Sequence, residues 1–115
     1  MMRTLKPRLP RAFLGALASL LLGGASAAEP ARAVVELKAF MFAPTALTVT
    51  AGTAVTWQNL DPEPHSVAST DGAFRSGALD EGESFTFTFA TPGTYRYVCS
   101  IHPQMTGTVI VTGRP

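Results

Sequence analysis

Residues 93–105 read Gly-Thr-Tyr-Arg-Tyr-Val-Cys-Ser-Ile-His-Pro-Gln-Met. Tyr95, Tyr97 and Cys99 alternate along the first part of this stretch, so a strand here would place all three side chains on one face. Cys99 ends the predicted strand, and the six residues after it predict a tight loop. Such a loop can bring His102 and Met105 back towards the thiol at one end of a β-sheet.

The chain beyond residue 28 consists of short alternating segments separated by turn residues, and no segment of useful length has helical periodicity. The clearest strand spans 84–89, with three phenylalanines on one face and hydroxyl groups on the other. The other predicted strands are 34–38, 47–50, 54–59, 65–68, 94–99 and 107–112. About seven to eight strands at this spacing predict an all-β fold, an antiparallel Greek-key sandwich.

We expect large apolar side chains to form the core of this sandwich. The predicted core residues are Trp57, Met41 and the stripe Phe85, Phe87 and Phe89. The acidic residues lie scattered in turns and read as solvated surface. Asp61 and Glu63 are the exception, because both lie close to His65 in the chain; a tuning or docking charge is the alternative interpretation for them.

The only cysteine of the chain, its two histidines and a methionine make up a metal-ligand set: His65, Cys99, His102 and Met105. A thiolate, two imidazoles and a weak axial thioether are the ligands of a mononuclear blue-copper site. Taken singly, each side chain reads as a core thiol, a surface histidine or a core methionine. Their occurrence together predicts a site for one copper ion. This site leaves no coordination position open to a substrate, so we expect no enzyme and no catalytic residues.

Residues 1–28 have the pattern of a secretory signal peptide. Four basic residues precede an apolar run at 12–22, and small residues follow up to Ala28. The run is well short of the roughly 20 residues that span a membrane, and an uncleaved anchor is the alternative. We therefore expect a signal peptide at 1–28, a single folded domain at 29–115 and export to the periplasm.

Removal of residues 1–28 changes the charge balance. The whole chain has a net charge of +1, but five basic and eight acidic residues in 29–115 give −3. A mildly acidic small domain lacks the basic surface that nucleic-acid binding requires. A single cysteine cannot form an internal disulfide, so a metal ligand is a good reason for an exported protein to keep one thiol.

The sequence resembles the cupredoxins, the small blue-copper proteins. The resemblance rests on the block from Gly93 to Gly107, on Pro64-His65, and on the upstream patterns at 40–44 and 47–59. The short spacing between His102 and Met105 is similar to that of the amicyanins rather than the plastocyanins or pseudoazurins. The resemblance implies that the four ligands hold one type 1 copper ion, which cycles between Cu(I) and Cu(II).

The resemblance also implies where partners bind. The ring edge of His102 is expected to face solvent within a hydrophobic patch on which redox proteins dock transiently. The candidates for this patch are Ile101, Pro103, Gln104 and one of Met41 and Phe42. We expect a monomer with no stable membrane insertion after signal removal.

Two residues depart from the family pattern. The family often has Asn after the first histidine ligand, so Ser66 is expected to tie the ligand loop less firmly or differently. Amicyanins tend to carry Pro before the loop histidine, whereas Ile101 keeps a backbone N–H. We hypothesise that this N–H donates to the Cys99 sulfur and raises the reduction potential.

Three functions compete at this point. A periplasmic electron carrier fits the ligand set best. A copper carrier or chaperone is the alternative, but stored Cu(I) sites tend to be rich in Met and His, and only Met41 and Met105 lie beyond the signal. A copper oxidase or nitrite reductase needs further histidine-rich copper sites, which two histidines cannot supply.

Overall fold

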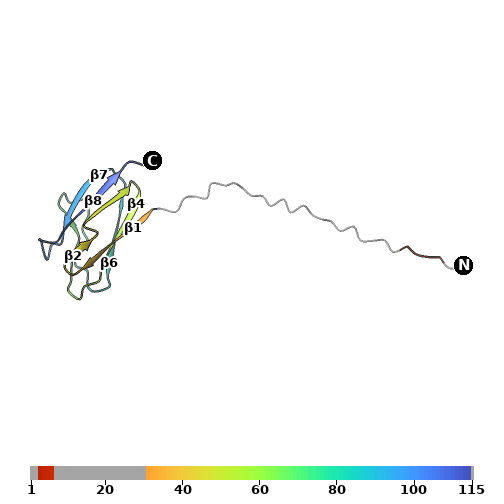
Figure 1. Cartoon of the computed structure of the whole chain (residues 1–115), viewed down its shortest axis with the longest axis horizontal. Helices are drawn as coiled ribbons and strands as arrows, with labels where there is room; N and C mark the ends of the chain where they lie inside the picture. The colour runs from red at the N-terminus through yellow and green to blue at the C-terminus, as the bar shows by residue number, and fades with distance from the viewer. Residues whose placement is uncertain (1–2, 7–30, 115) are drawn as a thin grey trace.

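The computed structural model describes residues 3–6 and 31–114 (Figure 1). Most of the predicted signal peptide at 1–28 therefore lies outside the described residues. No helix among the described residues is long and apolar enough to cross a membrane. The strands are β1 (Arg32–Lys38), β2 (Met41–Ala43), β3 (Ala46–Thr50), β4 (Thr53–Asn59), β5 (Ala68–Ser69), β6 (Ser84–Phe89), β7 (Gly93–Val98) and β8 (Thr106–Thr112).

The eight strands form two four-stranded sheets, with the orders β2-β1-β4-β6 and β3-β8-β7-β5. Figure 1 shows β7 and β8 on one side of the sandwich and β1, β4 and β6 on the other. The predicted all-β sandwich is confirmed. The pairing is mixed rather than purely antiparallel, because β1 runs parallel to β4 and β3 runs parallel to β8. The chain leaves the first sheet for β3 before it returns as β4, and such a crossover makes β1 and β4 parallel.

The predicted strand at 65–68 is the main local difference. His65 makes only an isolated antiparallel bridge to Leu79, and β5 is limited to two residues. The side chain of Ser76 accepts the hydrogen bond of the Val67 N–H at 2.8 Å, which takes this donor away from a strand partner. The short strand β2 was not predicted as a separate element.

An aromatic cluster fills the space between the sheets. Trp57 is fully buried, with its ring centroid 5.4 Å from that of Phe74 and 5.4 Å from that of Tyr97. Phe89 is buried, and Phe85 and Phe87 are partly buried against the same core. The core positions predicted for Trp57 and the phenylalanine stripe are confirmed.

The core position predicted for Met41 is wrong. Met41 is 57% exposed, whereas its neighbour Phe42 is 1% exposed. The strand β2 alternates exposed, buried and exposed along its three residues, so only its central side chain points between the sheets. Phe42 is the residue that packs edge-on against Tyr97, at a centroid distance of 4.7 Å.

The strand pairing brings three chain segments to one end of the sandwich. Because β1 and β4 are parallel, their last residues, Lys38 and Asn59, lie at the same end of the sheet. Val98 pairs with Thr106, so the loop between β7 and β8 is short and closed at its base. The turn after β1, the segment after β4 and the loop after β7 meet at this end.

Candidate metal centre

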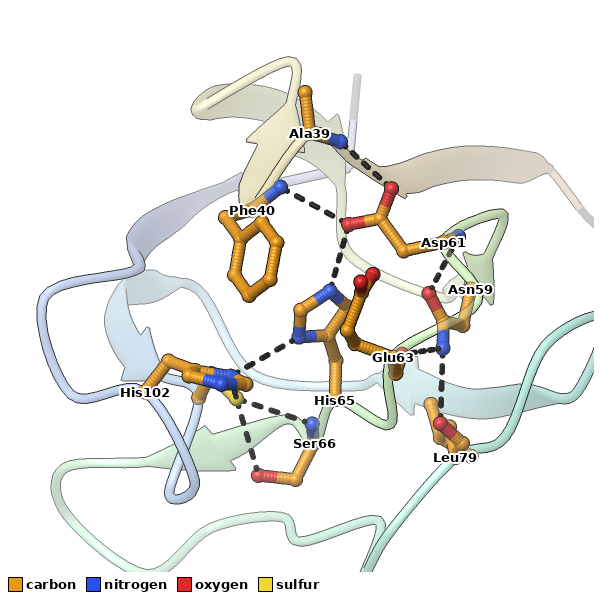
Figure 2. Close-up of polar contacts among 10 residues, drawn as sticks. Ala39, Phe40, Asn59, Asp61, Glu63, His65, Ser66, Leu79 and His102 are labelled. Atoms are coloured by element: carbon orange, nitrogen blue, oxygen red, sulfur yellow. Dashed lines mark hydrogen bonds and ion pairs between the residues drawn. The ribbon is translucent and has the colours of Figure 1, made fainter.

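Three potential ligands converge at the end of the sandwich. The ligand atoms of His65, Cys99 and His102 all lie within 4.8 Å of one another. The two Nδ1 atoms of the histidines are 3.3 Å apart, and Cys99 Sγ is 3.7 Å from the Nδ1 of His102. Figure 2 shows His65 between Asp61 and His102, with one ring nitrogen turned towards each. The structure thus brings together three of the four predicted ligands, and each of the two histidines faces the cluster with its Nδ1 atom.

The loop at 99–105 is closed by its own backbone. The Cys99 N–H donates to the carbonyl of Met105 at 3.0 Å, and the Met105 N–H donates to the carbonyl of His102 at 2.9 Å. These two bonds fold the loop back so that its first and last residues adjoin. Met105 is buried and lines a cavity of about 200 Å³ together with Phe40 and Met41. Its axial role stays a prediction.

Ser66 connects the two parts of the site. The Ser66 N–H donates to Cys99 Sγ at 3.3 Å, and the Ser66 hydroxyl accepts the Ser100 N–H at 2.7 Å. The hydroxyls of Ser66 and Ser100 are also hydrogen-bonded, at 2.6 Å. Ser66 thus ties the ligand loop through both its N–H and its hydroxyl. Among the described residues, the backbone donor to this sulfur is Ser66, and no hydrogen bond from Ile101 is present.

Asp61 fixes the orientation of His65. The Nε2 of His65 lies 2.7 Å from Oδ2 of Asp61, and both side chains are buried. A carboxylate accepts hydrogen bonds, so Nε2 carries the ring proton and Nδ1 keeps a free lone pair for a metal. Burial acts to raise the pKa of Asp61, but hydrogen bonds from the Phe40 N–H, from His65 and from the Ala39 N–H outweigh burial and lower it.

The two carboxylates that the sequence places near His65 have different roles. Asp61 contacts the histidine directly, whereas Glu63 is exposed and takes part through its backbone carbonyl. That carbonyl accepts a hydrogen bond from the amide of Asn59 at 2.9 Å. The interpretation as a tuning charge therefore fits Asp61 and not Glu63.

Sequence reasoning missed two residues of the site. Asn59 donates to the carbonyls of Glu63 and Leu79 and accepts the Asp61 N–H, so it holds the segment before His65. An Asn two residues before an Asp at the end of a strand is a turn signal that could have indicated this role. Phe40 places its ring edge-on against His65 and His102, at centroid distances of 5.1 and 5.0 Å. No local sequence signal marks that contact.

His102 is half-buried, and the ring of Phe40 lies edge-on against it. Ile101 is 44% exposed, Phe40 41% and Met41 57%. Pro103 and Gln104 are also exposed. Of the two alternatives for this patch, Met41 is on the surface, while Phe42 is in the core.

The donor set fits one soft or borderline metal ion. A thiolate and two imidazoles suit copper or zinc, whereas Mg²⁺ and Ca²⁺ prefer oxygen ligands. The one carboxylate in contact with the site, that of Asp61, binds the far nitrogen of His65 and so supports a ligand rather than acting as one. The residues present therefore fit a mononuclear copper centre.

Comparison with known proteins gives a consistent result. The cupredoxin-like domain family matches residues 11–111. Amicyanin-alpha of Methylorubrum extorquens is 32% identical over 118 residues, which cover 96% of this chain and 99% of the relative. A purple cupredoxin from Nitrosopumilus maritimus is 33% identical with a TM-score of 0.65, over 70% of this chain and 99% of that one. The Cu-containing nitrite reductase from Thermus scotoductus is 32% identical with a TM-score of 0.69, but the match covers only 23% of the reductase and 76% of this chain.

Proposed function

The chain belongs to the cupredoxin-like domain family, and from this premise we propose that it is a small blue copper protein that carries single electrons between redox partners. The observation that supports this most directly is the convergence of His65, Cys99 and His102 within 4.8 Å. The similarity to amicyanin-alpha over nearly the whole length of both chains supports it further.

In this proposal the Nδ1 atoms of His65 and His102, the thiolate of Cys99 and the thioether of Met105 would hold the metal. Copper bound by these four side chains supplies a one-electron couple between Cu(II) and Cu(I). The role of the polypeptide is to hold the ligands in place and to exclude water. Ser66 holds the sulfur in place, because its N–H donates a hydrogen bond to the thiolate.

The proposed partners are redox proteins that dock transiently around His102. Its imidazole is half-buried and contacts the ring of Phe40, while Phe40, Met41 and Ile101 are exposed apolar residues. A small apolar contact would suit a weak, short-lived complex, which is the norm for electron transfer. Residues 1–28 are proposed to be an export signal, so that residues 29–115 work as a monomer in the periplasm, without nucleic acid.

A copper carrier remains the second candidate, because Met41 and Met105 line one cavity next to the metal centre. Two thioethers at one opening suit Cu(I). Nitrite reduction is not part of the proposal, since the chain spans only 23% of the reductase that it resembles.

The test is the visible spectrum of residues 29–115 loaded with Cu(II). An electron carrier is expected to be intensely blue, to bleach with a mild reductant and to recover its colour on oxidation without loss of copper. Cys99→Ser, which keeps the size of the side chain but removes the thiolate, should be colourless. A protein that binds only Cu(I), or that releases copper in each cycle, would contradict the proposal in favour of the copper carrier.

Export is tested separately, by the mass of the protein recovered from the periplasm of an expressing bacterium. Cleavage near Ala28 predicts a chain that begins at or close to Glu29. A full-length chain held in the membrane fraction would support the uncleaved anchor instead.

A further inference from the structure

The turn between β1 and β2 has an unusual backbone. Lys38 pairs with Met41, so the hairpin is closed by Ala39 and Phe40 alone. Both of these residues are left-handed, with φ of 52° and 57°. Such two-residue turns normally use Asn and Gly, because a Cβ atom disfavours this conformation. Neither Ala nor Phe has a side chain that offsets this cost locally, so the turn requires support from elsewhere in the fold.

That support comes from Asp61. Its Oδ1 accepts the Ala39 N–H at 2.8 Å, and its Oδ2 accepts the Phe40 N–H at 3.0 Å. The carboxylate thus binds both backbone donors of the turn from a segment more than twenty residues away in the chain. Hydrogen bonds to an ionised acceptor are roughly twice as strong as those between neutral groups.

The same carboxylate also binds the first histidine. Oδ2 of Asp61 lies 2.7 Å from the Nε2 of His65, while it accepts the N–H of Phe40 as well. The orientation of Asp61 is itself restricted, since its N–H donates to Oδ1 of Asn59 at 3.0 Å. A buried and anchored side chain therefore connects the turn to a metal ligand (Figure 2).

When this turn is held in position, it places the ring of Phe40 against both histidines. The ring of Phe40 meets His65 at an interplanar angle of 81° and His102 at 83°, both edge-on. Aromatic pairs in this arrangement contribute about 0.5–1.5 kcal/mol beyond the area that they bury. Phe40 thus restricts the ring of His102, a residue that Asp61 does not touch itself.

We propose that Asp61 and the Ala39–Phe40 turn form one clamp that orients both histidines before the metal binds. Asp61 is then a positioning residue: it acts on His65 by a hydrogen bond and on His102 through the ring of Phe40. The competing explanation is that the hairpin holds its own turn and that Asp61 supports His65 alone. The clamp is a property of the metal-free protein. Only the measurement of metal affinity rests on the proposed function.

The first experiment is NMR of the metal-free protein, which does not depend on copper binding. The variants are Asp61→Asn, Phe40→Leu and the control Glu63→Gln, which also removes a carboxylate from this segment but whose side chain is exposed. Asp61→Asn keeps the shape but offers only one acceptor oxygen for three N–H donors. It is expected to lose the protected Nε2–H signal of His65 and to shift the ring signals of His102. Phe40→Leu should shift the His102 ring signals but keep the His65 Nε2–H, and Glu63→Gln should change neither.

The outcomes separate the two explanations. If Asp61→Asn alters His65 but leaves the His102 ring signals and the Phe40 N–H unchanged, the clamp is overturned in favour of a purely local contact. If Asp61→Asn does not fold, Asp61→Glu takes its place, because it keeps the carboxylate but displaces it by one methylene. A changed His65 Nε2–H signal beside unchanged His102 ring signals then overturns the proposal, and a shift of both supports it.

The second experiment measures affinity for Zn²⁺, a redox-inert probe of the same ligand set. Loss of a hydrogen-bond partner of a ligand typically weakens metal affinity about 10- to 100-fold. We expect a loss of that size for Asp61→Asn, a smaller one for Phe40→Leu and none for Glu63→Gln. Equal losses for Asp61→Asn and Glu63→Gln would point to net charge and overturn the clamp. A chain that binds neither zinc nor copper would refute the proposed function while the NMR result for the clamp still stands.

Discussion

At the scale of single residues, Ser66 shows how one small side chain joins two distant segments. Its N–H binds the Cys99 sulfur, and its hydroxyl binds the backbone N–H of Ser100. Ser66 is 2% exposed, so water cannot readily replace these bonds. The ligand loop is thus tied at Cys99 and at Ser100, its first two residues.

Ser66→Ala should separate these two contributions. The variant keeps the N–H that binds Cys99 but leaves the Ser100 N–H without its acceptor, at a cost of about 1–3 kcal/mol in unfolding free energy. The colour of the Cu(II) form should change little. Ser100→Ala is the matched control, because it loses only the hydroxyl contact and keeps the backbone donor. Equal stability of the two variants in urea unfolding would contradict this account.

Tyr97 is a second residue with an uncommon environment. Within the part of the chain that the structure describes, the Tyr97 hydroxyl and the Trp57 indole N–H are buried without a hydrogen-bond partner. Burial raises the pKa of Tyr97 to about 12, because the ionised hydroxyl would lose its hydration, and the nearby indole opposes this rise only in part. The neutral hydroxyl is therefore strongly preferred in the folded state.

This environment predicts a loss of stability at high pH that Tyr97→Phe should remove. Below a pH of about 10, which is the pKa of an unfolded tyrosine, the hydroxyl is neutral in both the folded and the unfolded state, and its ionisation does not reduce stability. As pH rises from there towards the folded pKa of about 12, the unfolded chain ionises first and stability falls. Tyr97→Phe should match or exceed the wild type in urea unfolding at neutral pH and lose less at high pH. Tyr95→Phe is the contrast, since its hydroxyl donates to the Thr91 carbonyl and its removal should destabilise at neutral pH.

At the scale of strands, β7 and β8 depend on one close approach. Gly107 in β8 pairs with Tyr97 in β7, and a Cβ atom at Gly107 would overlap the Tyr97 ring. The glycine therefore makes room for a ring of the core cluster, in the strand that leads away from Met105. A larger residue would have to displace either the ring or the base of the ligand loop.

Gly107→Ala is expected to destabilise the protein by at least about 1–3 kcal/mol, the usual cost of overpacking a core. The near-ultraviolet circular dichroism of the tyrosine should change as its ring moves. Gly113→Ala serves as the control, because no atom lies within 4 Å of the Cβ that it adds. If both variants unfold at the same urea concentration, the close approach is not a constraint on this pair of strands.

At the scale of the whole molecule, the domain is small and its proposed ligands come from two connecting segments. His65 lies between β4 and β5, and the other three lie between β7 and β8. A domain of this size buries little more than 60% of its unfolded surface, so each long-range link matters. A metal held by His65 and by the loop at 99–105 would cross-link these parts, and its binding free energy would add to folding.

Metal should therefore raise the thermal stability of the whole domain. At a free Zn²⁺ concentration of about 1,000 times the dissociation constant, the gain is about 4.1 kcal/mol. The measurement is the unfolding temperature of residues 29–115 with and without Zn²⁺. Cys99→Ala should show almost no gain, and a gain as large as that of the wild type would mean that the metal binds elsewhere.

The sequence by itself determined the fold class, most strands and the set of candidate ligands. These properties depend on local patterns: side chains alternate along strands such as β6, turn residues separate them, and only a few residue types can bind a soft metal. The spacing from Cys99 to Met105 and the alternation of Tyr97 and Cys99 are also local, so the short loop and the buried thiol followed from them.

Only the tertiary structure decided how the ligands are held. Asp61 binds Ala39 and Phe40 across more than twenty residues, and Ser66 binds Cys99 across more than thirty. No periodicity records such contacts, because they arise from the parallel pairing of β1 with β4 and from the packing of one sheet on the other. The same packing places Phe42 in the core and leaves Met41 at the surface beside the metal centre. Local chemistry thus selects the ligands, and long-range geometry orients them.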